Sequence, residues 1–151
     1  MNKRATASKT PGSAIGIARY KIYKNGIGRI QNAIKSGYYL EAITLCESLI
    51  ADRLESRLKY LTGGDKYSFK TLGDIQKGIK KYETDSELRS IINSEVNKWR
   101  QKRNDALHAI GKLEEKKIEI WEDRIEKCKK IAEDGEKLRK RIFSIIDKLK
   151  K

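Results

Sequence analysis

Hydrophobic residues recur along this chain at spacings of three, four and seven positions, which is the period of an amphipathic α-helix. The widest apolar stripe runs from Tyr39 to Leu61 without a break and is flanked by further leucines. The sequence "TGGD" at 62–65 then ends the helix. A stripe of this width predicts a central and mostly buried helix.

Further helices are predicted from the same periodicity over about residues 15–36, 67–82, 84–110 and 112–149. The short one, within 67–82, carries Phe69 on its apolar face. The next opens on a capping box, in which Thr84 is the N-cap and Glu87 reaches back to it. In the last, the apolar pattern starts at Leu113 and slips in phase near Gly135, which predicts either one long helix or two joined there.

The composition agrees with helices, because the chain has one proline, few β-branched runs and 37% charged residues. Its 151 residues and 38% hydrophobic content suffice for one compact core. We therefore predict an all-α protein, a four- to five-helix bundle with a long C-terminal helix, in a single domain over 15–151. Residues 1–14 hold the only proline and few apolar groups, so they are predicted to be a disordered basic tail.

The charge balance favours a polyanionic partner. Lysine and arginine number 35 against 21 aspartates and glutamates, a net charge of +14 that attracts nucleic acid. The alternative is that lysine-rich helices are simply well solvated, since the lysines are spread over nearly every segment. Charge alone does not distinguish an enzyme from a binding protein.

The cysteines and the single histidine argue against a metal site. Cys46 and Cys128 each lie among apolar neighbours on a helical pattern, so both are predicted to be reduced core thiols. There is no CxxC sequence and no second histidine, so we predict neither a metal nor another cofactor. The sequence has no secretory signal and no apolar run long enough to cross a bilayer, which predicts a cytoplasmic protein with no membrane partner.

The sequence "RQKRNDALHAI" at 100–110 holds the candidate site. On a projection of about 100° per residue, Arg103 lies about 40° from Trp99, on the apolar seam of its helix. A guanidinium keeps its charge, so Arg103 must extend to solvent, pair with a carboxylate, or face a cleft that receives an anion. The first two roles are structural, and only the third is functional.

The opposite face of the same helix carries polar side chains, namely those of Asn97, Gln101, Asn104 and His108. It has few of the lysines and glutamates of a solvated surface, which indicates a site or an interface. A single histidine on a helix is ordinarily a surface residue. Moreover, Arg103 and His108 diverge by about 140° on a straight helix, so either the helix is irregular or a second copy of the chain completes the site.

The segment from Arg103 to His108 fits the R-x4–6-H motif, with a polar residue, Asn104, directly after the arginine. In this motif the chain resembles the HEPN superfamily of all-helical domains, named for higher eukaryotes and prokaryotes nucleotide-binding. It is also similar in size, in its broad second helix with "EAITLCESLIADRL", and in the motif's place near the junction of the last two major helices. The resemblance covers roughly residues 15–150.

Many HEPN proteins are metal-independent endoribonucleases, commonly toxins or antiviral effectors, in which two protomers bring their motifs together. The resemblance implies that Arg103 and His108 are catalytic, that Asn104 supports them, and that the protein cuts RNA to leave 2′,3′-cyclic phosphate ends. It also implies a homodimer and an antitoxin or larger defence complex as partner. In one branch of the family a modifiable tyrosine follows two positions after the histidine; Ile110 stands there, so adenylylation at that position is not supported.

The residues next to the motif, Arg100, Gln101 and Lys102, are predicted to bind RNA.

Two other functions remain open. One is a non-catalytic helical module that binds RNA or a partner protein, using basic side chains interleaved with tyrosines at Arg19, Tyr20, Lys21, Tyr23, Lys24 and Arg29. The other is a structural domain whose long final helix associates through Trp121, Ile125, Ile142 and Ile145.

Overall fold

The computed structural model describes residues 12–115 and 117–150, and these residues contain helices but no β-strand. The helical elements are α1 (Ala14–Ser36), α2 (Tyr39–Thr62), α3 (Leu72–Tyr82), α4 (Ser86–Ile91), η1 (Ile92–Val96), α5 (Asn97–Ala109) and α6 (Trp121–Leu149). Because α4, η1 and α5 follow one another without a gap, they form one continuous helix. The predicted all-α bundle with a long C-terminal helix is confirmed.

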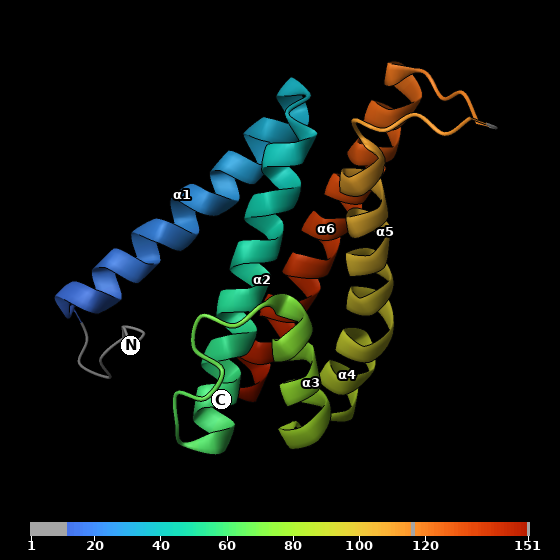
Figure 1. The fold of residues 1–151 in the computed structure, drawn as a ribbon. Helices are drawn as coiled ribbons and strands as arrows, with labels where there is room; N and C mark the ends of the chain where they lie inside the picture. The colour runs from blue at the N-terminus through green and yellow to red at the C-terminus, as the bar shows by residue number, and fades with distance from the viewer. Residues whose placement is uncertain (1–11, 116, 151) are drawn as a thin grey trace.

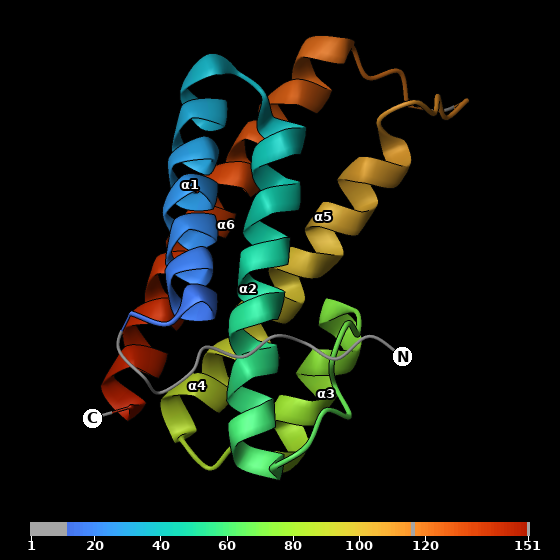
Figure 2. The same cartoon turned by 90° about the vertical axis from the view of Figure 1, so that its left-hand side faces the viewer.

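Helix α2 lies at the centre of the bundle and contacts α1, α3 and α6 (Figures 1 and 2). Helix α6 runs alongside both α2 and α5, and α3 lies against the C-terminal half of α2 (Figure 1). The buried residues of α2 are Ala42, Ile43, Cys46, Leu49, Ile50, Leu54, Glu55 and Leu58. The prediction of a central, mostly buried helix from its apolar stripe is therefore confirmed.

The first helix begins and ends on local hydrogen bonds. The Ser13 hydroxyl accepts a hydrogen bond from the Gly16 amide at 3.1 Å, so α1 starts at Ala14, inside the predicted disordered tail. Gly37 ends it in the left-handed conformation, with φ of 83°, which glycine adopts without a steric penalty. Residues 1–11 of the predicted tail lie outside the described residues.

Element η1 is a single π-helical turn in the middle of the predicted fourth helix, over 84–110. Such a turn has hydrogen bonds five residues apart, so it contains one residue more than an α-helical turn. The Ile92 carbonyl accepts a hydrogen bond from Gln76 of α3 at 2.9 Å, so a neighbouring helix contributes to this turn. The predicted helix over 84–110 is therefore irregular at 92–96, and helical projection is valid only from Asn97 onward.

The turn between α3 and α4 differs from the predicted capping box by one residue. Asp85, not Thr84, is the N-cap, and its carboxylate accepts the Leu88 amide at 2.8 Å. The Glu83 carboxylate accepts hydrogen bonds from the backbone amides of the two residues that follow it, Thr84 and Asp85. It also pairs with Arg57 of α2 through two hydrogen bonds of 2.7 and 3.0 Å. Burial alone would raise the pKa of Glu83, but Arg57 and the backbone donors outweigh it and lower that pKa.

Helix α6 is uninterrupted at Gly135, which decides between one helix and two. The Trp99 indole of α5 packs against this glycine and donates a hydrogen bond to the Ile131 carbonyl at 2.8 Å. A Cβ at residue 135 would lie 2.8 Å from the indole Cζ2, closer than two carbon atoms can approach. Glycine at this position therefore allows α5 and α6 to cross closely.

Two apolar residues assigned to helices lie elsewhere. Leu113 belongs to the irregular connection between α5 and α6 and is 72% exposed, because α6 begins only at Trp121. Phe69 precedes α3, has a φ of 59° and is 69% exposed. Helix α3 instead starts after Thr71, whose hydroxyl accepts the Asp74 amide. Periodicity does not separate such residues from true core positions.

The contact between Trp99 and Gly135 generates a stability prediction. Gly135→Ala should lower the free energy of unfolding by about 1–3 kcal/mol, because the added methyl group overlaps the indole and outweighs the better helix propensity of alanine. Gly28→Ala is the matched control, since a Cβ at residue 28 meets nothing within 4 Å, and it should stabilise the protein by up to about 1 kcal/mol. Urea unfolding followed by circular dichroism measures both changes, and equal stabilisation by the two would contradict the packing argument.

Candidate functional site

The motif arginine points from α5 towards α2. Arg103 donates to Glu47 through Nη2, and the two side chains are 18% and 27% exposed. Arg103 is therefore largely buried, in keeping with its place on the apolar seam of the helix. Of the three arrangements considered for a guanidinium on an apolar seam, the structure has the pair with a carboxylate.

Glu47 is the site residue that the sequence reasoning missed. On a helical projection it lies about 40° from Ile43 and 60° from Ile50, at the edge of the buried stripe of α2. Arg103 lies about 40° from the buried Trp99 on α5, so each helix carries one charge at the margin of its apolar face. Two opposite charges in equivalent marginal positions are the signal that could have predicted the pair.

The opposite face of α5 is polar and exposed. His108 and Gln101 are exposed, Asn104 is half-buried, and none of these side chains has a hydrogen bond or ion pair with a residue that the structure describes. Because α5 is a regular α-helix, Arg103 and His108 diverge by about 140° around its axis. One copy of the chain does not bring the arginine and the histidine together.

The flanking residues predicted to bind RNA differ in their environments. Arg100 is half-buried and donates from Nε to Gln76 of α3 at 3.0 Å and from Nη2 to Asn97 at 3.4 Å. Gly73 leaves room for it, since a Cβ there would lie 3.2 Å from Arg100 Nη1. Arg100 thus connects α5 to α3, whereas Lys102 and the neighbouring glutamine remain exposed on the surface.

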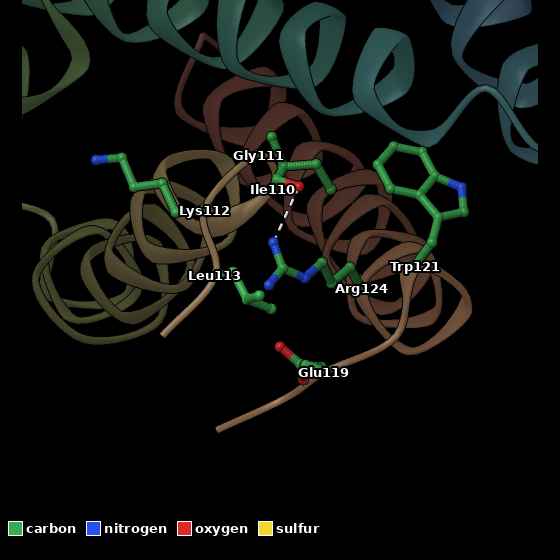
Figure 3. A pocket seen from close by; sticks show the side chains of 7 residues that line it. All are labelled: Ile110, Gly111, Lys112, Leu113, Glu119, Trp121 and Arg124. Carbon is green, nitrogen blue, oxygen red and sulfur yellow. Dashed lines mark hydrogen bonds between the residues drawn. The ribbon is translucent and has the colours of Figure 1, made fainter. Parts of the chain in front are cut away.

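A shallow hollow lies beyond the end of α5, next to the turn that carries His108. Figure 3 shows Arg124 of α6 reaching into it and donating to the Ile110 carbonyl at 3.0 Å. A second hydrogen bond joins Arg124 to the Ala109 carbonyl, so this arginine satisfies the last carbonyls of the helix. The hollow has a volume of about 240 Å³ and is lined by Ile110, Gly111, Lys112, Leu113, Glu119, Trp121 and Arg124.

The apolar side chains around this hollow are unusually exposed. Trp121 is 58% exposed and Ile118 is 84% exposed, and Leu113 and Ile120 are exposed as well. Large apolar side chains that are exposed close together in the sequence are typical of interaction surfaces. We refer to Leu113, Ile118, Ile120 and Trp121 as the apolar loop.

Both cysteines are buried and unpaired, as predicted. Burial raises the pKa of the Cys46 thiol to about 12 and also raises that of Cys128, so neither thiol is activated as a nucleophile. Within residues 12–115 and 117–150 no three metal-binding side chains come together. No helix in the same ranges combines the length and hydropathy needed to cross a bilayer.

Comparisons with protein-family models, curated proteins and solved structures gave no match to this chain. The assignment to the HEPN superfamily therefore remains a resemblance. It is based on the motif in α5 and on the helical architecture around it.

The contribution of the ion pair between Arg103 and Glu47 to the stability of the fold can be measured. In a double-mutant cycle with Arg103→Ala and Glu47→Ala, the two side chains should show a coupling free energy of about 1 kcal/mol in urea unfolding. The more exposed pair of Arg29 and Glu41, with side chains 66% and 38% exposed, is the matched control and should couple more weakly, because solvent screens it. Coupling no larger than in the control would mean that solvent screens the Arg103 pair equally well.

Proposed function

We propose that the chain is a metal-independent endoribonuclease of the HEPN type, whose active site forms where two copies bring their motifs together. The observation that supports this proposal most directly is the exposed and unengaged position of His108. It is the only histidine, it is exposed on a regular helix, and no described residue engages it. A histidine so placed is available to exchange protons with a bound substrate.

The chemistry requires three groups. A base must take the proton of the 2′-OH, an acid must protonate the leaving 5′ oxygen, and a cation must stabilise the charge that develops on the phosphorane. Two His108 side chains supply the base and the acid, and Arg103 supplies the cation. The 2′ oxygen bonds to phosphorus as the bond to the 5′ oxygen breaks, which leaves a 2′,3′-cyclic phosphate and a 5′-hydroxyl.

Two copies are needed because of the helix geometry. Arg103 and His108 lie on different sides of α5, so within one copy they cannot contact the same phosphate. A two-fold axis beside α5, on the side between Arg103 and His108, would bring both residues of each copy towards one cleft. The apolar loop lies at the same end of the molecule and would be covered in such a dimer.

Glu47 has a defined part in this proposal. Its hydrogen bond fixes the direction of the Arg103 guanidinium, and a fixed cation stabilises a transition state better than a mobile one. Asn104 lies directly after the arginine and has no partner among the described residues, so its amide is available to a ribose or phosphate oxygen. In this proposal the protein acts as a toxin or an antiviral effector, and an antitoxin controls its activity.

A second candidate, binding of RNA without cleavage, is favoured by one observation. The charge of Arg103 is already balanced by Glu47, and Arg100 is held by Gln76. Both arginines would then serve the fold, and the net charge of +14 would bind the phosphate backbone without cutting it.

Cleavage assays distinguish the two functions. His108→Ala and Arg103→Ala should each lower the rate of RNA cleavage by about two orders of magnitude or more, because each removes a transition-state interaction. RNA affinity should change much less, since it depends mainly on the diffuse charge. Cleavage should survive EDTA, and strands with 2′-deoxyribose at the cut position should resist it.

Lys98→Ala is the matched control for these assays, since Lys98 is an exposed cation on the same helix that has no assigned role. It should cut RNA at the normal rate. If the purified protein cuts neither structured nor single-stranded RNA but binds both, the binding module is the correct function. Equal cleavage by His108→Ala would also refute the proposed mechanism.

Assembly is tested separately from chemistry. The protein should sediment as a dimer at roughly tens of micromolar, and Trp121→Ala should weaken the dimer by about tenfold or more, because exposed tryptophans are common binding hot spots. Tyr60→Ala is the matched control, as Tyr60 is 79% exposed near the other end of the bundle. A monomer at those concentrations would argue strongly against the shared active site.

A further inference from the structure

A second hollow lies between α1, α2 and the C-terminal part of α6. It has a volume of about 280 Å³ and is lined by Arg19, Tyr20, Tyr23, Ile27, Arg53 and Phe143. Five of these six side chains are either arginine or aromatic. Planar rings and guanidinium groups are the side chains that proteins use to hold nucleobases and phosphates.

The arrangement of the hollow is fixed by contacts among its own residues. The rings of Tyr23 and Phe143 lie 5.5 Å apart, and the Arg53 guanidinium lies 5.8 Å from the first and 5.0 Å from the second. The Tyr23 hydroxyl and Arg19 both donate to Asp52, and Arg53 pairs with Asp147. The hollow is therefore preorganised, which lowers the entropy lost when a ligand binds.

Positive charge exceeds negative charge around this hollow. Lys150 lies 4.0 Å from Asp147, and its pKa is lowered by burial and by the nearby Arg53 and Arg19. Among the residues that the structure describes, Arg19, Arg53 and Lys150 lie near two carboxylates, those of Asp52 and Asp147. An anionic ligand would relieve the repulsion among the cations.

Tyr20 is the one ring at this hollow that is largely uncovered. Its side chain is 66% exposed, whereas Tyr23 packs partly buried against the core. An exposed tyrosine beside a cationic hollow offers a surface on which a base can stack. We propose that this hollow binds one nucleotide, with the base on Tyr20 and the phosphate near Arg19, Arg53 and Lys150.

The nucleotide site is separate from the motif. Helix α6 joins the two regions, and the stretch from Arg124, which caps α5, to Phe143 spans about 28 Å at 1.5 Å per residue. Nucleotide binding here requires neither cleavage nor the motif histidine. The ligand is either a free mononucleotide or one unit of a single-stranded RNA, since both present a base and a phosphate.

Calorimetric titration tests the site with two probes, adenosine 5′-monophosphate and a short 2′-O-methyl oligoadenylate, which cannot be cut because its 2′ oxygens are blocked. Tyr20→Ala should weaken binding of at least one probe by about fivefold or more, the usual effect of losing a stacked base. Tyr20→Phe should retain normal affinity, because the ring is kept. Tyr38→Ala is the matched control, since Tyr38 is 65% exposed between α1 and α2, and it should bind normally.

The two probes identify the source of the nucleotide. Tyr20-dependent binding of the monophosphate alone indicates a free nucleotide, and Tyr20-dependent binding of the strand alone indicates RNA. Lys150→Gln should weaken the same probe while leaving binding of uncharged adenosine unchanged, which checks the position of the phosphate. Normal binding of both probes by Tyr20→Ala, or equal weakening by Tyr38→Ala, would overturn the proposal.

Discussion

The crossing of α5 over α6 depends on one contact, in which the Trp99 indole lies against Gly135. An indole buries about 150–250 Å² and brings one polar N–H that needs a partner, which here is the Ile131 carbonyl. This contact lies one helical turn before Arg103. Once it is made, helix geometry directs Arg103 towards α2 and His108 away from the bundle. The position of the motif is therefore a consequence of core packing.

Much of the architecture could be predicted because helices record their buried faces at a period of 3.6 residues. The stripe of α2 is an example. The π-helical turn could not be predicted, because Leu88, Ile92 and Val96 are apolar and fit a straight helix equally well. Leu113 was wrongly predicted to lie in a helix, because it continues the apolar pattern of the last helix although it lies in the connection before α6.

The candidate site could be located from the sequence, but its contacts could not. Projection of one helix showed that Arg103 needed a partner or a cleft, and it left the choice open. The partner, Glu47, is 56 residues away in the sequence, and their contact depends on how α2 and α5 are placed around α6. The exposure of His108 could be predicted, because a polar face opposite a core tryptophan must point outward. Whether a second copy of the chain faces His108 depends on the surface formed by several elements together, which the pattern of one helix does not encode.

Arginine and lysine have different tasks in this protein. Arginines bridge helices through carboxylates, as in the pairs of Arg57 with Glu83 and Arg53 with Asp147. Arg139 and Glu136 form a pair that is almost completely buried within α6. The planar guanidinium suits such contacts because it donates in fixed directions. Much of the net positive charge is thus left to exposed lysines, which can form a diffuse field without disturbing the packing.

The π-helical turn has a consequence for how this helix tolerates changes in length. Its extra residue sets the rotation of everything that follows, from Trp99 to the end of α5. Deleting one residue between 92 and 96 would convert the turn to a regular α-helix and leave the downstream part in place, because the π-helical turn already absorbs that residue. A regular α-helix that kept all five residues would instead rotate the downstream part by about 100°. Trp99 would then leave its groove on α6, and His108 would face a different side of the molecule. The π-helical conformation of this one turn therefore determines the orientation of the motif as strictly as the identity of its residues does.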